Sequence, residues 1–355
     1  MRQPTPNTGM FGNITLLANI ERALKHIWTV KQSKKPDYKS FGTKPNVVII
    51  LSCKRSGTSF FGELFNQNPD VFYVFEPLMY FTYMALNHEI SNDKFDTLSL
   101  KMIESISTCD IHHIPYLSKW WEKGYNRRLS INFKGLSMES GIKKISERCN
   151  VSKLIAIKTI RVADIALLRD FIESEKANVK VLHLVRDPRA VMNSRWKLKE
   201  PNSDFLRKRR NGNATDEVVD LCQHTTRNIE YVSSKPDWLR GKYKLLRYED
   251  VASFPIESSI EIYNFLGIDY PSALTDWLNN NTNKQSGNPY GTSRVSYQII
   301  NNWRKEIALN KLNEIQEKCK HTMTSLGYEV LNGEKQLLDI DGKIAYKAFT
   351  KPEFT

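Results

Sequence analysis

Residues 47–65 read VVIILSCKRSGTSFFGELF, and this stretch decides the fold. It opens with an uninterrupted apolar run, which is typical of a strand buried on both faces of a parallel sheet. A polar turn with one glycine follows, and apolar side chains then recur at helical spacing from Phe60 onward. A strand, a Ser/Thr/Gly turn and a helix form the layout of an anion-binding loop, in which backbone N–H groups and the helix N-terminus face the anion.

The turn also carries side chains suited to an anion. Its hydroxyl donors and cations are Ser56, Thr58, Ser59, Lys54 and Arg55. It is not a Walker A loop, because that pattern needs G-x-x-x-x-G-K-[ST], whereas here Gly57 is followed by Thr58 and the cations precede the glycine. The stretch therefore predicts an anion site of another kind, and an ordinary strand–turn–helix corner is the alternative.

Further strands and helices alternate along the chain. Strands are predicted at residues 71–75, 154–158, 179–185 and 243–247, and helices at residues 163–174, 216–234, 256–266 and 305–326. Residues 273–296 are rich in Asn, Gly, Ser and Thr and are expected to form a loop. The alternation predicts an α/β fold with a central parallel sheet of about five strands flanked by helices.

Several polar residues follow the predicted strands directly. They are Arg55, Glu76, Lys158, Arg186 and Tyr248. In parallel sheets ligands bind at the carboxyl ends of the strands, so we expect these residues to share one cleft.

The composition bounds the class of protein. The chain has 355 residues, 40% of them hydrophobic, which excludes disorder throughout. The net charge of +13 favours a polyanionic partner such as nucleic acid, an anionic membrane, an acidic glycan or a phosphorylated cofactor, although a generally basic surface is the alternative.

The basic residues 207–212 are expected to form either a solvated loop or a glycan contact. Residues 10–30 lack the ~20 apolar residues of a membrane span and predict an amphipathic helix.

The five cysteines are widely spread and form no C-x-x-C motif, which argues against zinc. His112 and His113 lack partners at ligand spacing, so no metal site is predicted. An odd cysteine count leaves at least one free thiol if the chain is oxidised. The N-x-[ST] triplets at Asn13, Asn150, Asn213 and Asn280 favour the secretory pathway.

Two stretches carry a family resemblance. Residues 54–60, KRSGTSF, and residues 186–195, RDPRAVMNSR, resemble the two nucleotide-binding signatures of the carbohydrate sulfotransferases, in the branch that sulfates the 6-hydroxyl of Gal, GlcNAc or GalNAc. FEP at 75–77, LRYED at 246–250, WR at 303–304 and LGY at 326–328 also resemble this family. The resemblance implies a P-loop-like sulfotransferase domain at residues 46–330, with a stem or linker at 1–45 and a tail at 331–355.

The resemblance also implies the co-substrate and its binding residues. The co-substrate is 3′-phosphoadenosine 5′-phosphosulfate (PAPS), used without a metal, and the partner is a glycan or glycosaminoglycan acceptor, not a nucleic acid. The residues expected at the 5′-phosphosulfate are Lys54, Arg55, Ser56, Gly57, Thr58, Ser59 and Phe60, and those expected at the 3′-phosphate are Arg186, Asp187, Pro188, Arg189 and Ser194.

Within these sets, individual roles differ. Arg55 is expected to stabilise the leaving phosphate oxygen. Ser194 follows Arg186 by eight residues, about two helical turns, so both can face one anion. Asp187 is better suited to cap the helix than to bind phosphate, and Arg189 either joins the clamp or faces solvent.

Glu76 is the predicted base for the acceptor hydroxyl. The alternative for Glu76 is a structural ion pair with Arg55 or Lys158, and Glu63 is the alternative base. Lys158 and Arg161 are candidates for orienting the acceptor. Trp303 is expected either to stack on the adenine or a sugar or to lie in the core, and residues 248–250 to hold the sheet edge and the cofactor loop.

The resemblance further implies a Golgi enzyme with a Cys222–Cys319 disulfide, a free Cys53 and a sequon in use at Asn280. Such enzymes normally have an N-terminal membrane anchor, which is not evident in this sequence. Three alternatives stay open at this point: a nucleotide kinase or NTPase, a basic polyanion-binding module, and an inactive homologue. The acceptor sugar and the oligomeric state do not follow from the sequence.

Overall fold

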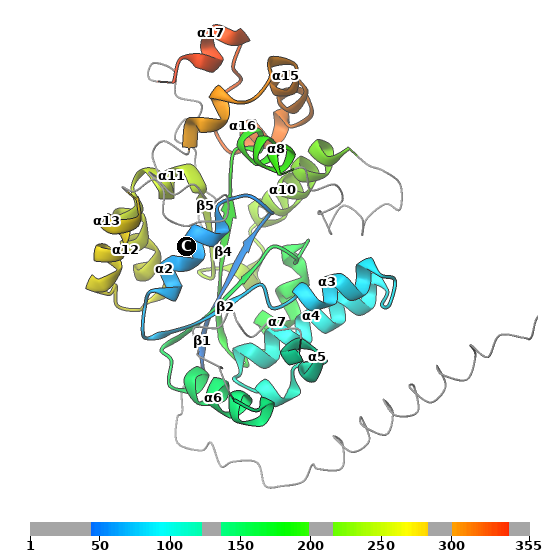
Figure 1. Cartoon of the computed structure of the whole chain (residues 1–355), viewed down its shortest axis with the longest axis vertical. Helices are drawn as coiled ribbons and strands as arrows, with labels where there is room; N and C mark the ends of the chain where they lie inside the picture. The colour runs from blue at the N-terminus through cyan, green and yellow to red at the C-terminus, as the bar shows by residue number, and fades with distance from the viewer. Residues whose placement is uncertain (1–43, 123–135, 199–215, 283–299, 341–355) are drawn as a thin grey trace, which may run out of the picture. The chain divides into compact units, whose positions relative to one another are not determined.

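One parallel β-sheet organises the fold (Figure 1). The computed structural model describes residues 44–122, 136–198, 216–282 and 300–340, and within them five strands pair in the order β2-β3-β1-β4-β5. The strands are β1 (Asn46–Ser52), β2 (Val71–Phe75), β3 (Leu154–Thr159), β4 (Asn178–Val185) and β5 (Tyr243–Arg247). In the central strand, Val47 pairs with Ile155 of β3 and with Val179 of β4. The predicted α/β class and parallel five-strand sheet are confirmed.

Helices cover both faces of the sheet, because successive side chains of a strand point to opposite faces. Val48 and Ile50 pack in a layer with α2 (Thr58–Asn66), α11 (Tyr248–Ser253), α12 (Pro255–Leu266) and α13 (Ser272–Thr282). Val47 and Ile49 pack in a layer with α3 (Met79–Leu86), α4 (Asn92–Ser107), α5 (Leu117–Glu122), α6 (Met138–Asn150), α7 (Arg169–Glu173), α8 (Pro188–Lys197), α10 (Glu217–Ser233), α15 (Leu309–Lys318), α16 (Lys320–Ser325) and α17 (Gly333–Leu338). Short 3-10 helices are η1 (Ile111–His113), η3 (Ile165–Leu168), η4 (Asp237–Leu239) and η5 (Trp303–Lys305).

Three predicted segments differ from the structure. The predicted loop at 273–296 is wrong over its first part, where α13 forms because Leu274 and Leu278, four residues apart, bury completely against the sheet layer. The single helix predicted at 305–326 is instead η5, α15 and α16, with a break at Cys319. The helix predicted at 163–174 begins as η3, where Asp164 accepts a hydrogen bond from Ala166 N at 2.9 Å, and continues as α7.

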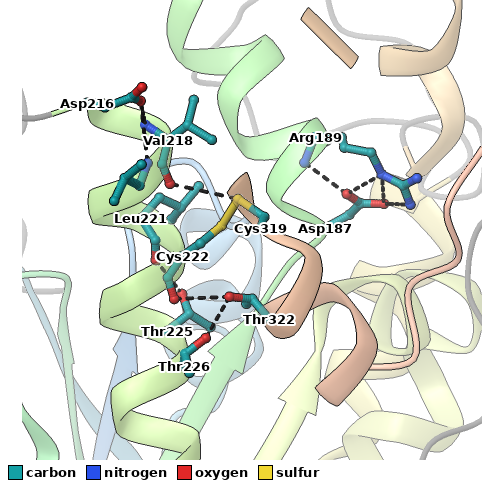
Figure 2. Close-up of a disulfide and its surroundings, with 11 residues drawn as sticks. Asp187, Arg189, Asp216, Val218, Leu221, Cys222, Thr225, Thr226, Cys319 and Thr322 are labelled. Carbon is teal, nitrogen blue, oxygen red and sulfur yellow. Dashed lines mark hydrogen bonds and ion pairs between the residues drawn. A yellow bond between two sulfur atoms is a disulfide. The ribbon is translucent and has the colours of Figure 1, made fainter. Parts of the chain in front are cut away.

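Two disulfides lie in the described residues. The pair Cys222–Cys319 joins α10 to the break between α15 and α16, which confirms the bond expected from the resemblance (Figure 2). The pair Cys109–Cys149 was not predicted; it joins the turn after α4 to α6. Cys53 is the cysteine that forms no disulfide in the described residues, as predicted. Beside the first disulfide, Thr322 Oγ1 donates to the Cys222 carbonyl at 3.1 Å, so a hydrogen bond reinforces the same junction.

The C-terminal part of the described chain stays packed beyond residue 330. The guanidinium of Arg304, 1% exposed, donates to the carbonyls of Gln336, Leu337 and Asp339. Residues 331–339, assigned from the sequence to a tail, are therefore held by η5. None of the helices in the described ranges has the length and apolar character needed to cross a membrane. The predicted amphipathic helix at 10–30, the basic residues 207–212, and the sequons at Asn13 and Asn213 lie outside the described residues.

The stability of the fold is expected to depend on pH through His183 on β4. Its ring is buried, Nδ1 lies 2.9 Å from the Tyr243 hydroxyl, and burial lowers the pKa of His183 to about 4. The folded state keeps the ring neutral, whereas the unfolded chain binds a proton below about pH 6.5. The unfolded state therefore gains protons first, and we expect acidification from pH 6.5 to 4 to lower the free energy of unfolding by on the order of 3 kcal/mol through this group.

The measurement is urea denaturation at several pH values for wild type and His183→Gln, whose amide can still bond Tyr243. The variant should show a shallower loss of stability in this window. Equal slopes in the two proteins would contradict a role for His183.

Candidate functional site

The loop between β1 and α2 has the backbone of an anion cradle. Arg55 and Gly57 have positive φ angles of 73° and 82°, and α2 begins at the next residue, Thr58. The helix has no side-chain hydrogen bond at its N-cap, Gly57, and no acidic residue in its first turn. Its first N–H groups thus lack a side-chain partner there, and its dipole favours a negative charge in front of the turn.

Gly57 is required by a close approach as well as by its φ angle. A Cβ atom at this position would lie 2.2 Å from a ring carbon of Tyr248, a buried residue at the start of α11. Tyr248 thus packs directly against the loop, as expected for residues 248–250. The same ring lies under the Arg186 guanidinium, 4.5 Å from ring centroid to Cζ. One tyrosine therefore contacts both predicted signatures.

The two predicted signatures meet through three side chains. Arg55 Nε donates to Ser194 Oγ at 2.9 Å, and Arg186 Nη1 donates to the Arg55 carbonyl at 3.1 Å. The Nε atom of Arg186 is buried and has no hydrogen-bond partner among the described residues. A buried guanidinium donor left without an acceptor fits an anionic ligand at this point. Arg55, Arg186 and Ser194 therefore lie together, as the sequence predicted.

Asp187, Pro188 and Arg189 build the start of α8 instead of lining the loop. Asp187 Oδ1 accepts from Arg189 N at 2.9 Å, which makes it the N-cap, and Pro188 takes the first helical position. The Arg189 guanidinium is ion-paired with Asp187 at 2.7 Å (Figure 2), donates to Gln316 Oε1 and lies 4.9 Å from the Trp303 ring. Both Arg189 and Trp303 are buried. Arg189 was expected either to join the 3′-phosphate clamp or to face solvent. It does neither, because its side chain points into the interior.

The remaining loop residues differ in exposure. Ser59 is exposed, whereas Ser56 and Thr58 are buried and Ser56 Oγ lies 2.7 Å from the Cys53 sulfur. Phe60 stacks on Trp277 of α13, with ring centroids 6.2 Å apart. The Lys54 carbonyl accepts from Arg195 Nε and Nη2 at 3.3 and 3.2 Å. Arg195, the last residue of the second signature, thus also ties the two signatures together, a role we did not predict.

Glu76 is the buried carboxylate nearest the end of β2. Its φ angle is 50°, and its N–H donates to the Lys158 carbonyl at 2.8 Å, so the chain turns sharply as the strand ends. The carboxylate is ion-paired with both Lys158 and Arg161; its own side chain is 2% exposed and that of Arg161 is 13% exposed. The expected alternative, an ion pair of Glu76 with Lys158, is thus present.

Glu63, the alternative base, points elsewhere. Its Oε2 accepts from Asn66 Nδ2 at 3.0 Å and from Gln67 Nε2 at 2.7 Å, so it is held at the C-terminal end of α2. The cradle is at the opposite end of that helix. Glu76 is therefore the better placed of the two carboxylates.

Glu249 is one of the residues 248–250 that were expected to hold the sheet edge and the cofactor loop, but the sequence did not indicate its specific partners. Its Oε1 accepts from Asp187 N at 3.0 Å, and its Oε2 accepts from the Tyr328 hydroxyl at 2.8 Å. Burial raises the pKa of Glu249, Asp187 raises it further, and Arg186 lowers it. The signal in the sequence was only its place in LRYED directly after a strand.

Comparison with known proteins gives consistent matches. The sulfotransferase domain family matches residues 45–327. Carbohydrate sulfotransferase 1 of Danio rerio is 31% identical over 337 residues, covering 82% of this chain and 79% of the relative. Carbohydrate sulfotransferase 3 of Mus musculus is 26% identical over 372 residues, covering 90% and 75%. The crystal structure of mouse sulfotransferase SULT7A1 complexed with PAP is 14% identical, with a TM-score of 0.39, covering 80% of this chain and 86% of that one.

Proposed function

This chain belongs to the sulfotransferase family and is related to the carbohydrate sulfotransferases, and from that premise we propose that it moves the sulfuryl group of PAPS to the 6-hydroxyl of a Gal, GlcNAc or GalNAc residue in a glycan. The observation that carries the proposal is the junction of Arg55, Ser194 and Arg186, with the buried Arg186 Nε left without a partner among the described residues. PAPS has two anionic groups, which the cradle and this junction suit.

The residues take the following parts. The N–H groups from Gly57 to Ser59, with the Ser59 hydroxyl, hold the 5′-phosphosulfate at the start of α2. Arg186 and Ser194 bind the 3′-phosphate, which a guanidinium fork matches bidentately. Arg55 faces the leaving phosphate oxygen, and its hydrogen bond to Ser194 couples the two phosphate positions.

Bond changes in the transfer are few. A new bond forms between the acceptor oxygen and sulfur, the bond between sulfur and the 5′-phosphate oxygen breaks, and the acceptor proton passes to the Glu76 carboxylate. Sulfuryl transfer is mostly a matter of positioning and charge stabilisation, as phosphoryl transfer is. Arg161 is proposed to bind the acceptor or the sulfuryl oxygens, and its greater exposure among the partners of Glu76 supports this role.

The compartment proposed is the Golgi lumen. Two disulfides in the described residues suit an oxidising compartment, because disulfides are rare in the cytosol. The sequons at Asn150 and Asn280 are exposed, so either can carry a glycan there.

The test of function is transfer of ³⁵S from labelled PAPS to chondroitin, desulfated keratan and GlcNAc-terminated oligosaccharides. Label on the C6 oxygen of one sugar would support the proposal and identify the acceptor. Binding of PAP without transfer to any acceptor would favour the inactive homologue, and binding of polyanions irrespective of the nucleotide would favour the basic module.

Arg186→Ala is expected to weaken PAP binding about 10- to 100-fold, the usual range for a lost hydrogen bond to a charged group. Calorimetric titration with PAP and with adenosine 5′-monophosphate (AMP), which lacks the 3′-phosphate, checks the assignment. Wild type should prefer PAP, and the variant should lose most of that preference. Arg240→Ala is the matched control, since Arg240 is 66% exposed and its ion pair within the described part of the chain is a local one with Asp237. If Arg186→Ala still prefers PAP over AMP as strongly as wild type, Arg186 does not bind the 3′-phosphate.

A further inference from the structure

The dipeptide Tyr248-Glu249 contacts both nucleotide signatures at once. The Tyr248 ring fills the space that a side chain at Gly57 would occupy and lies under the Arg186 guanidinium. The Glu249 carboxylate accepts the backbone N–H of Asp187, the residue that follows Arg186. Both side chains are buried, with exposed fractions of 5% and 2%. The contact is therefore made in the interior, behind the surface that meets the nucleotide.

A buried carboxylate beside an anion site needs a physical reason. Glu249 lies close enough to Asp187 for their charges to repel, and a negative charge near the 3′-phosphate does not help to bind it. Its hydrogen bonds supply the reason. The bond to Asp187 N restrains the peptide between Arg186 and Asp187, at the point where the chain leaves β4 and enters α8. That peptide sets the direction in which the Arg186 side chain leaves the sheet.

The second oxygen of Glu249 connects this turn to the C-terminal part of the chain. It accepts from the Tyr328 hydroxyl at 2.8 Å, and burial raises the pKa of Tyr328 well above its ordinary value, so the hydroxyl remains a donor. Arg247, two residues before Glu249, donates to the Leu326 carbonyl at 2.9 Å. The turn at residues 326–328 is thus bound twice to the segment that carries Glu249.

We propose that Glu249 is a positioning residue for the 3′-phosphate clamp: it fixes the Arg186–Asp187 peptide, and Tyr328 holds Glu249 in place from the C-terminal turn. This inference rests on the proposed function, because it assumes that Arg186 binds the 3′-phosphate. Glu249 itself touches neither nucleotide nor acceptor. Its effect should therefore be confined to ligands that carry a 3′-phosphate.

The test compares PAP and AMP binding by calorimetry in wild type, Glu249→Leu, Glu249→Gln and Tyr328→Phe. Glu249→Leu loses both hydrogen bonds and should weaken PAP binding about 10-fold, with AMP binding unchanged. Glu249→Gln should stay within about 3-fold of wild type, since its oxygen can accept from Asp187 N while its amide donates to Tyr328. Tyr328→Phe keeps the ring but loses the hydroxyl, and it should weaken PAP binding about 3-fold. If Glu249→Leu does not fold, this variant tests the positioning role of Glu249 in its place.

A merely structural role predicts a different pattern. It would weaken PAP and AMP binding equally, and its effect would add to that of Arg186→Ala. Positioning through Arg186 predicts that Glu249→Leu costs nothing further in PAP affinity when Arg186 is already Ala. Equal loss for both nucleotides, or full additivity, would overturn the inference. If wild type itself shows no preference for PAP over AMP, the proposed function fails first, and the inference with it.

Discussion

Replacing Glu76 by Gln is expected to lower kcat about 10²- to 10⁴-fold, the usual contribution of a general base, while PAP binding stays near the wild-type value. The amide keeps the shape of the side chain but cannot take a proton from the acceptor hydroxyl. The nucleotide contacts proposed above involve the loop after β1 and the turn after β4, whereas Glu76 follows β2. The loss should therefore be in turnover and not in affinity for the nucleotide.

The ion pairs of Glu76 add a second effect that has to be separated. Removing one partner of a buried ion pair costs about 3–5 kcal/mol of stability, because a buried charge is left uncompensated. Lys158 is buried with Glu76, so the variant should also unfold at lower urea concentration. Activity has to be expressed per folded protein, with the folded fraction taken from circular dichroism under assay conditions.

Two further variants complete the Glu76 experiment. Glu63→Gln is the matched control, since it makes the same chemical change on the far end of α2, and it should keep kcat within about 3-fold of wild type. Glu76→Asp keeps the negative charge and should recover most of the stability but only part of the turnover, because the carboxylate is one methylene shorter. If folded Glu76→Gln turns over like wild type, Glu76 is a structural partner of Lys158 and Arg161 and another group is the base.

Removing the Cys222–Cys319 disulfide, by replacing both cysteines with Ser, is expected to lower the free energy of unfolding by about 4–5 kcal/mol. The two cysteines are 97 residues apart in the sequence. The disulfide restricts the unfolded chain by closing this long loop, so removing the bond increases the conformational entropy of the unfolded state. Both cysteines are buried, with 3% and 1% of their surfaces exposed. The loss is thus comparable to a large share of the stability of an ordinary domain.

The second disulfide provides the comparison. Cys109–Cys149 closes a separation of 40, so replacing that pair should cost about 0.8 kcal/mol less by the same chain-entropy relation. Urea denaturation without reductant, on both double variants and wild type, measures the difference. A loss below about 1 kcal/mol for Cys222→Ser/Cys319→Ser would show that packing and hydrogen bonds hold the C-terminal helices without the cross-link.

The disulfide also bears on the site, because Tyr328 lies nine residues beyond Cys319. If the C-terminal turn holds Glu249 as proposed, the Cys222→Ser/Cys319→Ser protein should bind PAP more weakly before it unfolds globally. The loss of affinity should match that of Tyr328→Phe in sparing AMP.

The sequence by itself determined the strands, the turn and helix that follow the first strand, and the family resemblance. A continuous apolar run predicts a buried strand, and Gly57 with its polar neighbours predicts the turn that follows. Both features are local properties of the sequence. The predicted strand at 243–247 matches β5, and the predicted helix at 256–266 differs from α12 by one residue. Arg55 and Arg186 could be placed close together because the ends of parallel strands meet at one edge of the sheet, and their hydrogen bond confirms this proximity.

Only the tertiary structure decided which side chains of each motif lie at the proposed nucleotide site and which lie in the interior. Arg189 and Arg186 stand three residues apart in one signature, yet Arg189 is buried against Asp187 and Gln316 while Arg186 keeps a donor without a partner in the described residues. Glu249 and Tyr328 are 79 residues apart and form a hydrogen bond. The helix α13 forms because Leu274 and Leu278 are buried against the helices and strands on one face of the sheet. Such contacts join distant segments of the chain, so no local pattern encodes them; burial and hydrogen-bond satisfaction select them when the elements pack.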